Sequence, residues 1–207
     1  MFTNTKFILA SNSESRFLIL KNNKLNFRQL SPICSEKKIK KQLINKKTSP
    51  KKTSLILAKA KAKSISKSKK NFLVVGSDTV IEFNKKIVHK AKNLKEAKKT
   101  LIKISGKKHL IYSSAAAYYK NKLVWRKTQK TKVKIRKISK KEIDTYLSHV
   151  GKNILKSAGC YQIEKDGPNI IENITGDFFN VMGFPLFPFL VFLKKFNVKK
   201  WAEKKLM

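Results

Sequence analysis

The sequence FLVVGSDT, residues 72–79, decides how the rest of the chain is interpreted. Its apolar run, 72–75, is typical of a short strand that is covered on both faces. The run leads directly into Gly76, Ser77 and Asp78, which places a carboxylate at the end of a buried strand. Such a carboxylate can hold a metal ion or take a proton from a water that attacks phosphorus, although an Asp in this position more often only caps a turn.

Strands and helices are predicted in alternation on both sides of this segment. Apolar runs and alternating patterns predict strands at 6–10, 25–30, 109–119, 123–138, 160–163 and 170–174. Start signals predict helices after the turn at 11–15, at 37–44, from Pro50 to 66, from Asn93 to 104, from Ser139 to 150 and from Pro185 onward. Because both kinds of element mix along the whole length, we expect an α/β fold with a mixed sheet.

Length and composition favour one globular domain. A chain of 207 residues with 41% hydrophobic residues and 13 Phe can bury a substantial core. We assign residues 1–198 to this domain and residues 199–207 to a short basic C-terminal tail.

The net charge of +37 comes almost entirely from lysine. Of the 49 basic residues, all are Lys except Arg16, Arg28, Arg126 and Arg136. Proteins that read nucleic acids usually rely on Arg, whose planar guanidinium binds phosphate and guanine with two hydrogen bonds. The Lys residues are also spread along the chain without regular interleaving with aromatic residues. We interpret the charge as compositional bias and predict no specific nucleic-acid partner; a basic nucleic-acid- or ribosome-binding module is the alternative.

The cysteines and the apolar stretches favour a cytoplasmic protein without a membrane partner. Cys34 and Cys160 lie far apart, with neither a CxxC pair nor zinc-ligand spacing, which favours a reducing compartment. The apolar run near the N-terminus is too short for a signal peptide. The stretch 184–196 contains two Pro and two Lys and falls short of a membrane span.

A second polar cluster follows the first predicted strand. Residues 11–16, Ser-Asn-Ser-Glu-Ser-Arg, lie at a helix start, where free backbone N–H groups and hydroxyls can bind an anion. An ordinary helix cap with a solvated Arg16 fits the same residues equally well.

The standard P-loop and dinucleotide-binding fingerprints are absent from the sequence. Among so many lysines, composition alone does not identify a functional one in the set Lys59, Lys61, Lys63 and Lys90. For His109, a structural role is the favoured interpretation, as for most single histidines.

Six segments together resemble the Maf family of nucleotide pyrophosphatases over nearly the whole chain. They are ILASNSESRFLIL (8–20), LAKAKAKS (57–64), VVGSDTVI (74–81), SGKKHLIYSS (105–114), SAGCYQIE (157–164) and ITGDFFNVMGFPL (174–186). The resemblance implies a Maf/ITPase-like fold: a long twisted mixed β-sheet with flanking helices, in two lobes around a central cleft. It also implies hydrolysis of a nucleoside triphosphate at its α–β bond with Mg²⁺ or Mn²⁺, a homodimer, and a link to cell-division arrest.

The resemblance also assigns roles to individual residues. Asp78 corresponds to the catalytic carboxylate, and Glu36 joins it as a metal ligand. The phosphate-binding positions are Ser11, Ser13, Arg16, Lys61 and Lys90. Because this set is intact, an inactive relative with an interaction role is the less favoured hypothesis.

Base specificity falls on three further positions. They are Ser15, Thr79 and Glu164. Thr79 matches members that act on dTTP and UTP, whereas Glu164 matches members that act on 7-methyl-GTP, so the preferred base stays open. The chain departs from the family pattern at Glu14, where a Pro is usual, and at the residues flanking Lys90. Ser15 and Glu164 stand where the members that prefer pyrimidines have an Arg and a Gln.

Overall fold

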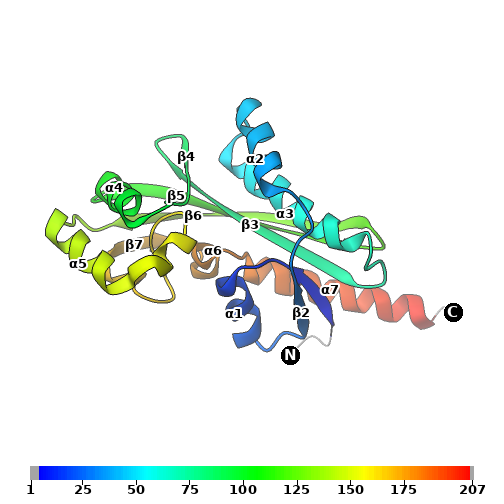
Figure 1. Ribbon diagram of the computed structural model, residues 1–207. Helices are drawn as coiled ribbons and strands as arrows, with labels where there is room; N and C mark the ends of the chain where they lie inside the picture. The colour runs from blue at the N-terminus through cyan, green and yellow to red at the C-terminus, as the bar shows by residue number, and fades with distance from the viewer. Residues whose placement is uncertain (1–4, 206–207) are drawn as a thin grey trace.

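The computed structural model describes the backbone of residues 5–205 and the side chains of residues 5–196 (Figure 1). Strands and helices alternate along it, as the sequence predicts. The strands are β1 (Phe7–Ala10), β2 (Phe27–Leu30), β3 (Leu73–Phe83), β4 (Lys86–Val88), β5 (Lys108–Tyr119), β6 (Lys122–Ile135) and β7 (Ile171–Thr175). The helices are α1 (Glu14–Asn22), α2 (Glu36–Asn45), α3 (Pro50–Ser66), α4 (Leu94–Ile104), α5 (Lys140–Val150), α6 (Phe178–Met182) and α7 (Leu186–Lys205), with short 3₁₀ turns η1 (Gly151–Lys156) and η2 (Gly167–Asn169).

The strands form one mixed sheet in the order β2-β1-β3-β5-β6-β7, with β4 added to β3. Strand β1 is parallel to β2 and β3, and the other pairs are antiparallel. Helices α2 and α3 lie on one side of the long strands, whereas α1 and α7 lie on the other (Figure 1). The predicted α/β fold with a long mixed sheet and flanking helices is therefore confirmed.

Separate hydrophobic clusters cover the two ends of the long strands. At one end, Phe83 of β3 and Ile111 of β5 pack with helices α4 and α5. At the other end, Leu73 and Val75 pack with β1, α1 and α7 on one face, while α3 covers the opposite face. These clusters are the cores of the two lobes.

The middle of the sheet, between the clusters, is polar although it is buried. Ser77, Asp78, Ser113 and Ser114 are all less than 9% exposed. Buried polar groups are retained only where they find partners. Here the Ser77 hydroxyl donates to the Ser114 carbonyl, 2.8 Å away. The sheet therefore carries a polar band where the lobes meet.

Strand β3 has an open edge at this band. Strand β1 pairs with residues 73–76 of β3, and β4 pairs with residues 81–83. Among the described residues, 77–80 therefore have a strand partner only on the β5 side. The gap between β1 and β4 leaves the edge of the sheet beside Asp78 and Thr79 without a strand partner.

Helix α3 lies against β3 with no space between their backbones at Gly76. A Cβ atom at this position would be 2.4 Å from the Ala58 carbonyl oxygen and 2.6 Å from the Ala62 nitrogen. Only glycine fits such an approach. The contact fixes the position of α3, and with it Lys61, relative to β3.

Several predicted boundaries are wrong. The apolar strand predicted at 72–75 continues as β3 to Phe83, so Asp78 lies inside a strand and not at its end. No strand forms at 160–163, because Cys160 has a φ of 56° within a turn. Strand β6 ends at Ile135 and not at 138; the following residue, Arg136, donates its N–H to the Ile170 carbonyl outside the strand.

The helix predictions agree better with the structure. Ser49 caps α3, Asn93 caps α4, and Ser139 and Glu142 form the expected capping box of α5. The tail predicted at 199–207 has its side chains outside the described part of the chain, so this assignment stays a prediction. None of the described helices is long and apolar enough to cross a membrane.

Candidate active site

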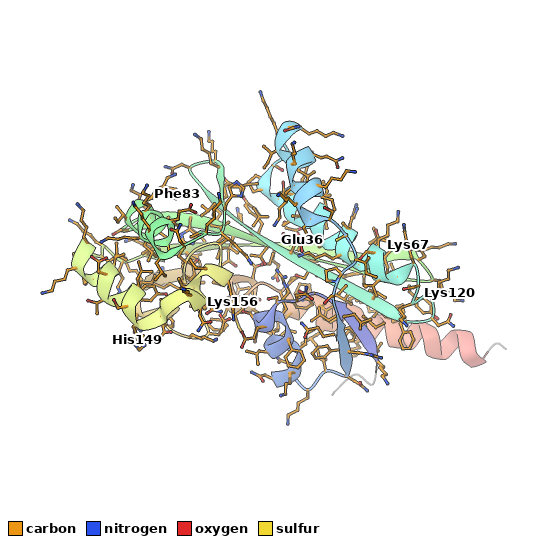
Figure 2. The ribbon with its side chains drawn as sticks, in the orientation of Figure 1. Glu36, Lys67, Phe83, Lys120, His149 and Lys156 are labelled. Atoms are coloured by element: carbon orange, nitrogen blue, oxygen red, sulfur yellow. The ribbon has the colours of Figure 1, made fainter. Side chains whose placement is uncertain are left out.

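All the residues assigned to the site from the sequence line one cavity of about 650 Å³. It lies at the polar band, against the open edge of β3. The residues are Ser11, Ser13, Ser15, Arg16, Glu36, Lys61, Asp78, Thr79, Lys90 and Glu164. Both lobes contribute to the walls; Figure 2 labels Glu36 and Lys156, which belong to different lobes.

Lys61 connects two carboxylates at the base of this cavity. Its Nζ lies 2.8 Å from Asp78 Oδ1 and 3.1 Å from Glu36 Oε1. Lys61 and Asp78 are almost completely buried, whereas Glu36 is partly exposed. Because the ammonium group lies between them, it reduces the repulsion between the two carboxylates.

Helix α2 brings Glu36 to the site. Ser35 caps the helix, so Glu36 stands in its first turn, where negative charge is favourable. Lys40, one turn later, has its Nζ 3.5 Å from Glu36 Oε2. Burial alone would raise the pKa of Glu36, but the charges of Lys61 and Lys40 outweigh burial and hold it below its usual value. Glu36 is therefore ionised at neutral pH.

Arg16 connects three segments of the chain. Its Nε donates to the Gly183 carbonyl at 2.9 Å, one terminal nitrogen donates to Thr79 Oγ1 at 3.0 Å, and the other to Ser11 Oγ at 3.3 Å. The side chain is only 8% exposed, so the solvated Arg considered from the sequence is not found. Burial lowers the pKa of Arg16, against the attraction of Asp78 and Glu36; an arginine remains charged nonetheless.

The hydroxyls of the first polar cluster also have structural partners. Ser13 caps α1 by accepting the Arg16 N–H at 3.4 Å. Ser11 accepts the Ser13 N–H at 3.2 Å in addition to the Arg16 guanidinium. The segment thus serves as a helix cap and at the same time lines the cavity.

The three positions linked to base specificity differ in how their side chains are used. Thr79 Oγ1 lies within hydrogen-bonding distance of Arg16, Ser113 and the Gly183 carbonyl. Glu164, in contrast, is held by the Ser15 hydroxyl, which donates to its Oε1. The Glu164 carboxylate therefore keeps acceptor capacity on the side of the cavity, whereas the Thr79 hydroxyl is engaged within the fold.

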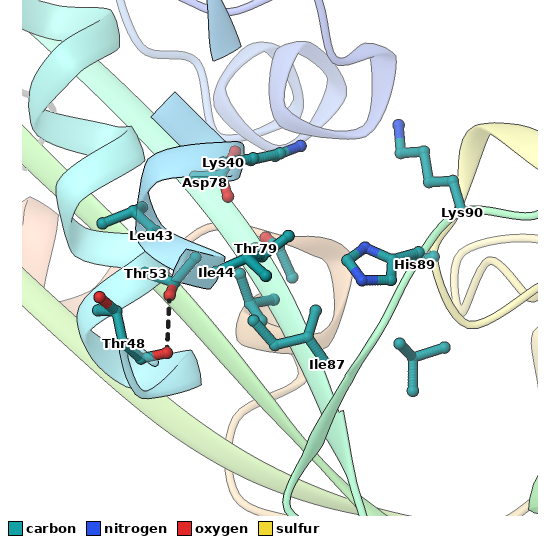
Figure 3. Close-up of a pocket in the computed structure, with 13 residues that line it drawn as sticks. Lys40, Leu43, Ile44, Thr48, Thr53, Asp78, Thr79, Ile87, His89 and Lys90 are labelled. Carbon is teal, nitrogen blue, oxygen red and sulfur yellow. Dashed lines mark hydrogen bonds between the residues drawn. The ribbon is translucent and has the colours of Figure 1, made fainter. Parts of the chain in front are cut away.

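A smaller pocket of about 90 Å³ adjoins the main cavity and shares Lys40, Asp78, Thr79 and Lys90 with it (Figure 3). Its walls are mostly apolar, with Leu43, Ile44 and Ile87 among them. Partial burial, followed by the positive charges of Arg16, Lys40 and Lys61, lowers the pKa of Lys90. The field at Lys90 is thus positive even with Asp78 nearby.

The carboxylates of the cavity can hold a divalent metal only if substrate atoms complete its coordination. Among the described residues, no group of three or more His, Cys, Asp or Glu side chains is able to hold a metal. Glu36 and Asp78 offer two carboxylates in one cavity. Mg²⁺ is commonly bound by one or two carboxylates, with substrate phosphates and water completing the coordination.

Some cavity residues were not predicted from the sequence. Lys40 and Lys156 line the cavity, and the Gly183 carbonyl accepts hydrogen bonds from Arg16, Ser77 and Thr79. The helical spacing of Glu36 and Lys40 is a signal for the first of these. Nothing in the local sequence marks Lys156, because it is one lysine among many.

His109 has the structural role favoured by the sequence. It is 2% exposed, and its Nε2 lies 2.6 Å from the hydroxyl of Tyr161, which lines the cavity. Burial lowers the pKa of His109 to about 4, so the ring is neutral at pH 7.

Comparison with known proteins identifies similar sequences over nearly the whole chain. Residues 6–196 match the family described as "Maf-like protein". The chain is 39% identical to a 7-methyl-GTP pyrophosphatase of Bartonella quintana (strain Toulouse), over 92% of this chain and 96% of that protein. It is 32% identical to a nucleoside triphosphate pyrophosphatase of Caulobacter vibrioides, over 92% of this chain and 95% of that protein.

Proposed function

The chain belongs to the Maf-like protein family, and from this premise we propose that it is a nucleoside triphosphate pyrophosphatase, a hydrolase that acts on an acid anhydride. The observation that carries the proposal is the buried Asp78–Lys61 pair with the partly exposed Glu36 beside it, in a cavity lined by further cations. A triphosphate matches such a site because it brings several negative charges and hard oxygen atoms.

In this reaction a water molecule attacks the α-phosphorus, and the bond to the bridging oxygen of pyrophosphate breaks. Asp78 Oδ1 accepts a hydrogen bond from Lys61, which orients the carboxylate at the wall of the cavity. We assign to Asp78 the proton that this water loses. Lys61 keeps the carboxylate oriented and stabilises its charge before the transfer, so its first role is positioning.

A divalent metal, Mg²⁺ or Mn²⁺, fits beside Asp78 and Glu36. When bound, it supplies positive charge to the phosphate oxygens, which helps an in-line displacement. The protein positions the reacting groups: Arg16 links the α1 segment to β3 and to Gly183, so that the phosphate-facing turn at 11–16 stays aligned with Asp78.

The contacts of Thr79 and Glu164 favour 7-methyl-GTP as substrate. A carboxylate accepts hydrogen bonds but donates none, so Glu164 suits the N–H groups on the pairing edge of guanine. Methylation at N7 gives the base a positive charge, which makes a bond to Glu164 charge-assisted and stronger. The Thr79 hydroxyl, which resembles that of dTTP- and UTP-cleaving members, is engaged with Arg16 and Gly183. Two relatives named 7-methyl-GTP pyrophosphatases support the same choice.

The test is pyrophosphate release from a panel of nucleotides that includes 7-methyl-GTP, GTP, dTTP and UTP. We expect fastest turnover of 7-methyl-GTP, and we expect Glu164→Gln to reduce the preference for 7-methyl-GTP over GTP by about tenfold or more. Glu172→Gln, which changes a carboxylate paired with Lys134 outside the cavity, is the matched control. An unchanged preference in Glu164→Gln would remove Glu164 from base recognition.

Three further properties remain proposals. A homodimer and a role in cell-division arrest come from the family resemblance, and a cytoplasmic location comes from the cysteines and the short apolar stretches of the sequence. Sedimentation of the purified chain tests the first of them directly.

A further inference from the structure

The two buried cations of the site are already bonded to protein atoms. Lys61 uses two of its N–H donors on Asp78 and Glu36. Arg16 donates to Gly183, Thr79 and Ser11, and it is 8% exposed. Both side chains hold the site together, and neither can move toward a ligand without breaking these bonds.

Two exposed lysines line the same cavity from different lobes. Lys40 stands on α2, which packs on α3, and Lys156 ends η1, which packs on α4 and α5. Lys156 forms no ion pair among the described residues, and Lys40 has only the 3.5 Å contact with Glu36. Their long side chains keep the freedom that the buried cations have lost.

The charge balance of the cavity leaves a place for an anion. The cavity holds the cations Arg16, Lys40, Lys61, Lys90 and Lys156, against the carboxylates Glu14, Glu36, Asp78 and Glu164. Glu36 and Asp78 are already paired with Lys61, and Glu164 is bonded to Ser15. Lys40, Lys90 and Lys156 therefore leave the cavity with positive charge that no carboxylate of its wall fully neutralises.

We propose that Lys40 and Lys156, together with Lys90, are the residues that bind the phosphates of the substrate and the released pyrophosphate. Lys61 and Arg16 then serve mainly to position Asp78, Glu36 and the turn at 11–16. Because Lys40 and Lys156 belong to different lobes, one polyphosphate bound by both would connect the two walls of the cavity. This assignment rests on the proposed function, which it extends to the ligand-binding residues.

The test measures binding of inorganic pyrophosphate to the full-length protein by calorimetry, at physiological salt. We expect Lys40→Ala and Lys156→Ala each to weaken binding by about tenfold, the loss typical of a charge-assisted hydrogen bond. Lys40→Arg and Lys156→Arg should retain most of the affinity. The matched controls are Lys41→Ala, on the same helix as Lys40, and Lys152→Ala, in the same turn as Lys156; neither residue lines the cavity.

The outcomes separate this assignment from the proposed function, because pyrophosphate binding requires no turnover. If all four alanine variants weaken binding equally, general attraction by the basic surface explains the affinity and the assignment is overturned. It is also overturned if the wild-type protein binds no pyrophosphate, or if Lys40→Ala and Lys156→Ala bind it normally. If the two cavity variants bind weakly while the wild-type protein cleaves no nucleotide, the assignment stands and the proposed function fails.

Discussion

Lys61 determines the electrostatics of the site at the scale of single residues. Two carboxylates close together would repel each other, and the pKa of one of them would rise. The ammonium group of Lys61 lies within 3.1 Å of both, which keeps Glu36 ionised. The sequence identified all three residues as candidates through their resemblance to family motifs. It did not predict that Lys61 bonds to both acids, because residues 36, 61 and 78 meet only in the folded chain.

His109 is a single residue that makes the stability of the protein depend on pH. Its pKa is about 4 in the folded protein, against 6.5 for an unperturbed histidine side chain. A lowered pKa means that the unfolded chain binds the proton first, so the stabilisation present above pH 6.5 is lost progressively as the pH falls toward 4. We expect this residue to reduce the free energy of unfolding by about 2 kcal/mol between about pH 7 and about pH 5.

Urea denaturation at the two pH values checks this expectation. His109→Gln removes the titrating group and should lose this part of the pH dependence, whatever its stability at pH 7. His149→Gln, an exposed histidine, is the control and should behave like the wild-type protein. An equal pH dependence in His109→Gln would show that other groups cause it.

At the scale of elements, strand β3 explains why the site lies in the middle of the sheet. The sequence predicted a strand only over the apolar residues 72–75, because Gly76, Ser77 and Asp78 are typical turn residues. In the fold, β5 pairs with β3 from Val74 to Glu82, and this long-range pairing overrides the local preference. The helix starts were predictable from their caps, which are local, whereas the length of β3 depends on a partner distant in sequence.

Gly76 provides a test of how α3 and β3 position the site. Gly76→Ala places a methyl group against the Ala58 carbonyl and the Ala62 nitrogen, which are backbone atoms and cannot turn away. We expect a loss of about 1–3 kcal/mol of stability and a reduced kcat, since Lys61 moves away from Asp78 with α3. Gly106→Ala is the control: it adds strain in a turn with a φ of 68°, but its nearest neighbours are 3.8 Å away.

Thermal unfolding and turnover of both glycine variants are the measurements. Gly106→Ala should lose about 1 kcal/mol of stability through its left-handed backbone and keep full kcat. Wild-type stability and kcat in Gly76→Ala would mean that the close approach of α3 is not required.

At the scale of the whole molecule, the charge of +37 is a separate feature from the cavity at the open edge of β3. Lysines are spread over the helices α1–α5 and strand β6, whereas β1, β2, β3 and β7 contain none. On β6 most of them are exposed, and charged side chains on an exposed strand disfavour pairing with other chains. The spread of the lysines along the chain was evident from the sequence, and it argues against a nucleic-acid-binding module. The sequence could not distinguish the lysines of the cavity from the rest, because only the fold brings Lys40, Lys90 and Lys156 to one space.

The dispersed charge predicts a particular salt dependence for nucleic-acid binding. A random single-stranded RNA should bind at low salt and lose nearly all affinity at about 0.15 M salt, because the binding comes from counterion release alone. Fluorescence anisotropy at the two salt concentrations measures this. Tight binding that survives at the higher concentration and depends on RNA sequence would instead support the nucleic-acid-binding alternative.

The proposed function depends on proton transfer to Asp78 in the cavity. The most direct test is the single-turnover rate of pyrophosphate release by Asp78→Asn, on whichever nucleotide the wild-type protein cleaves fastest. Glu82→Gln, on the same strand but outside the cavity, is the matched control. We predict that Asp78→Asn folds normally and loses at least about a hundredfold in rate, while Glu82→Gln keeps the wild-type rate. A wild-type rate in folded Asp78→Asn would show that Asp78 does not take this proton.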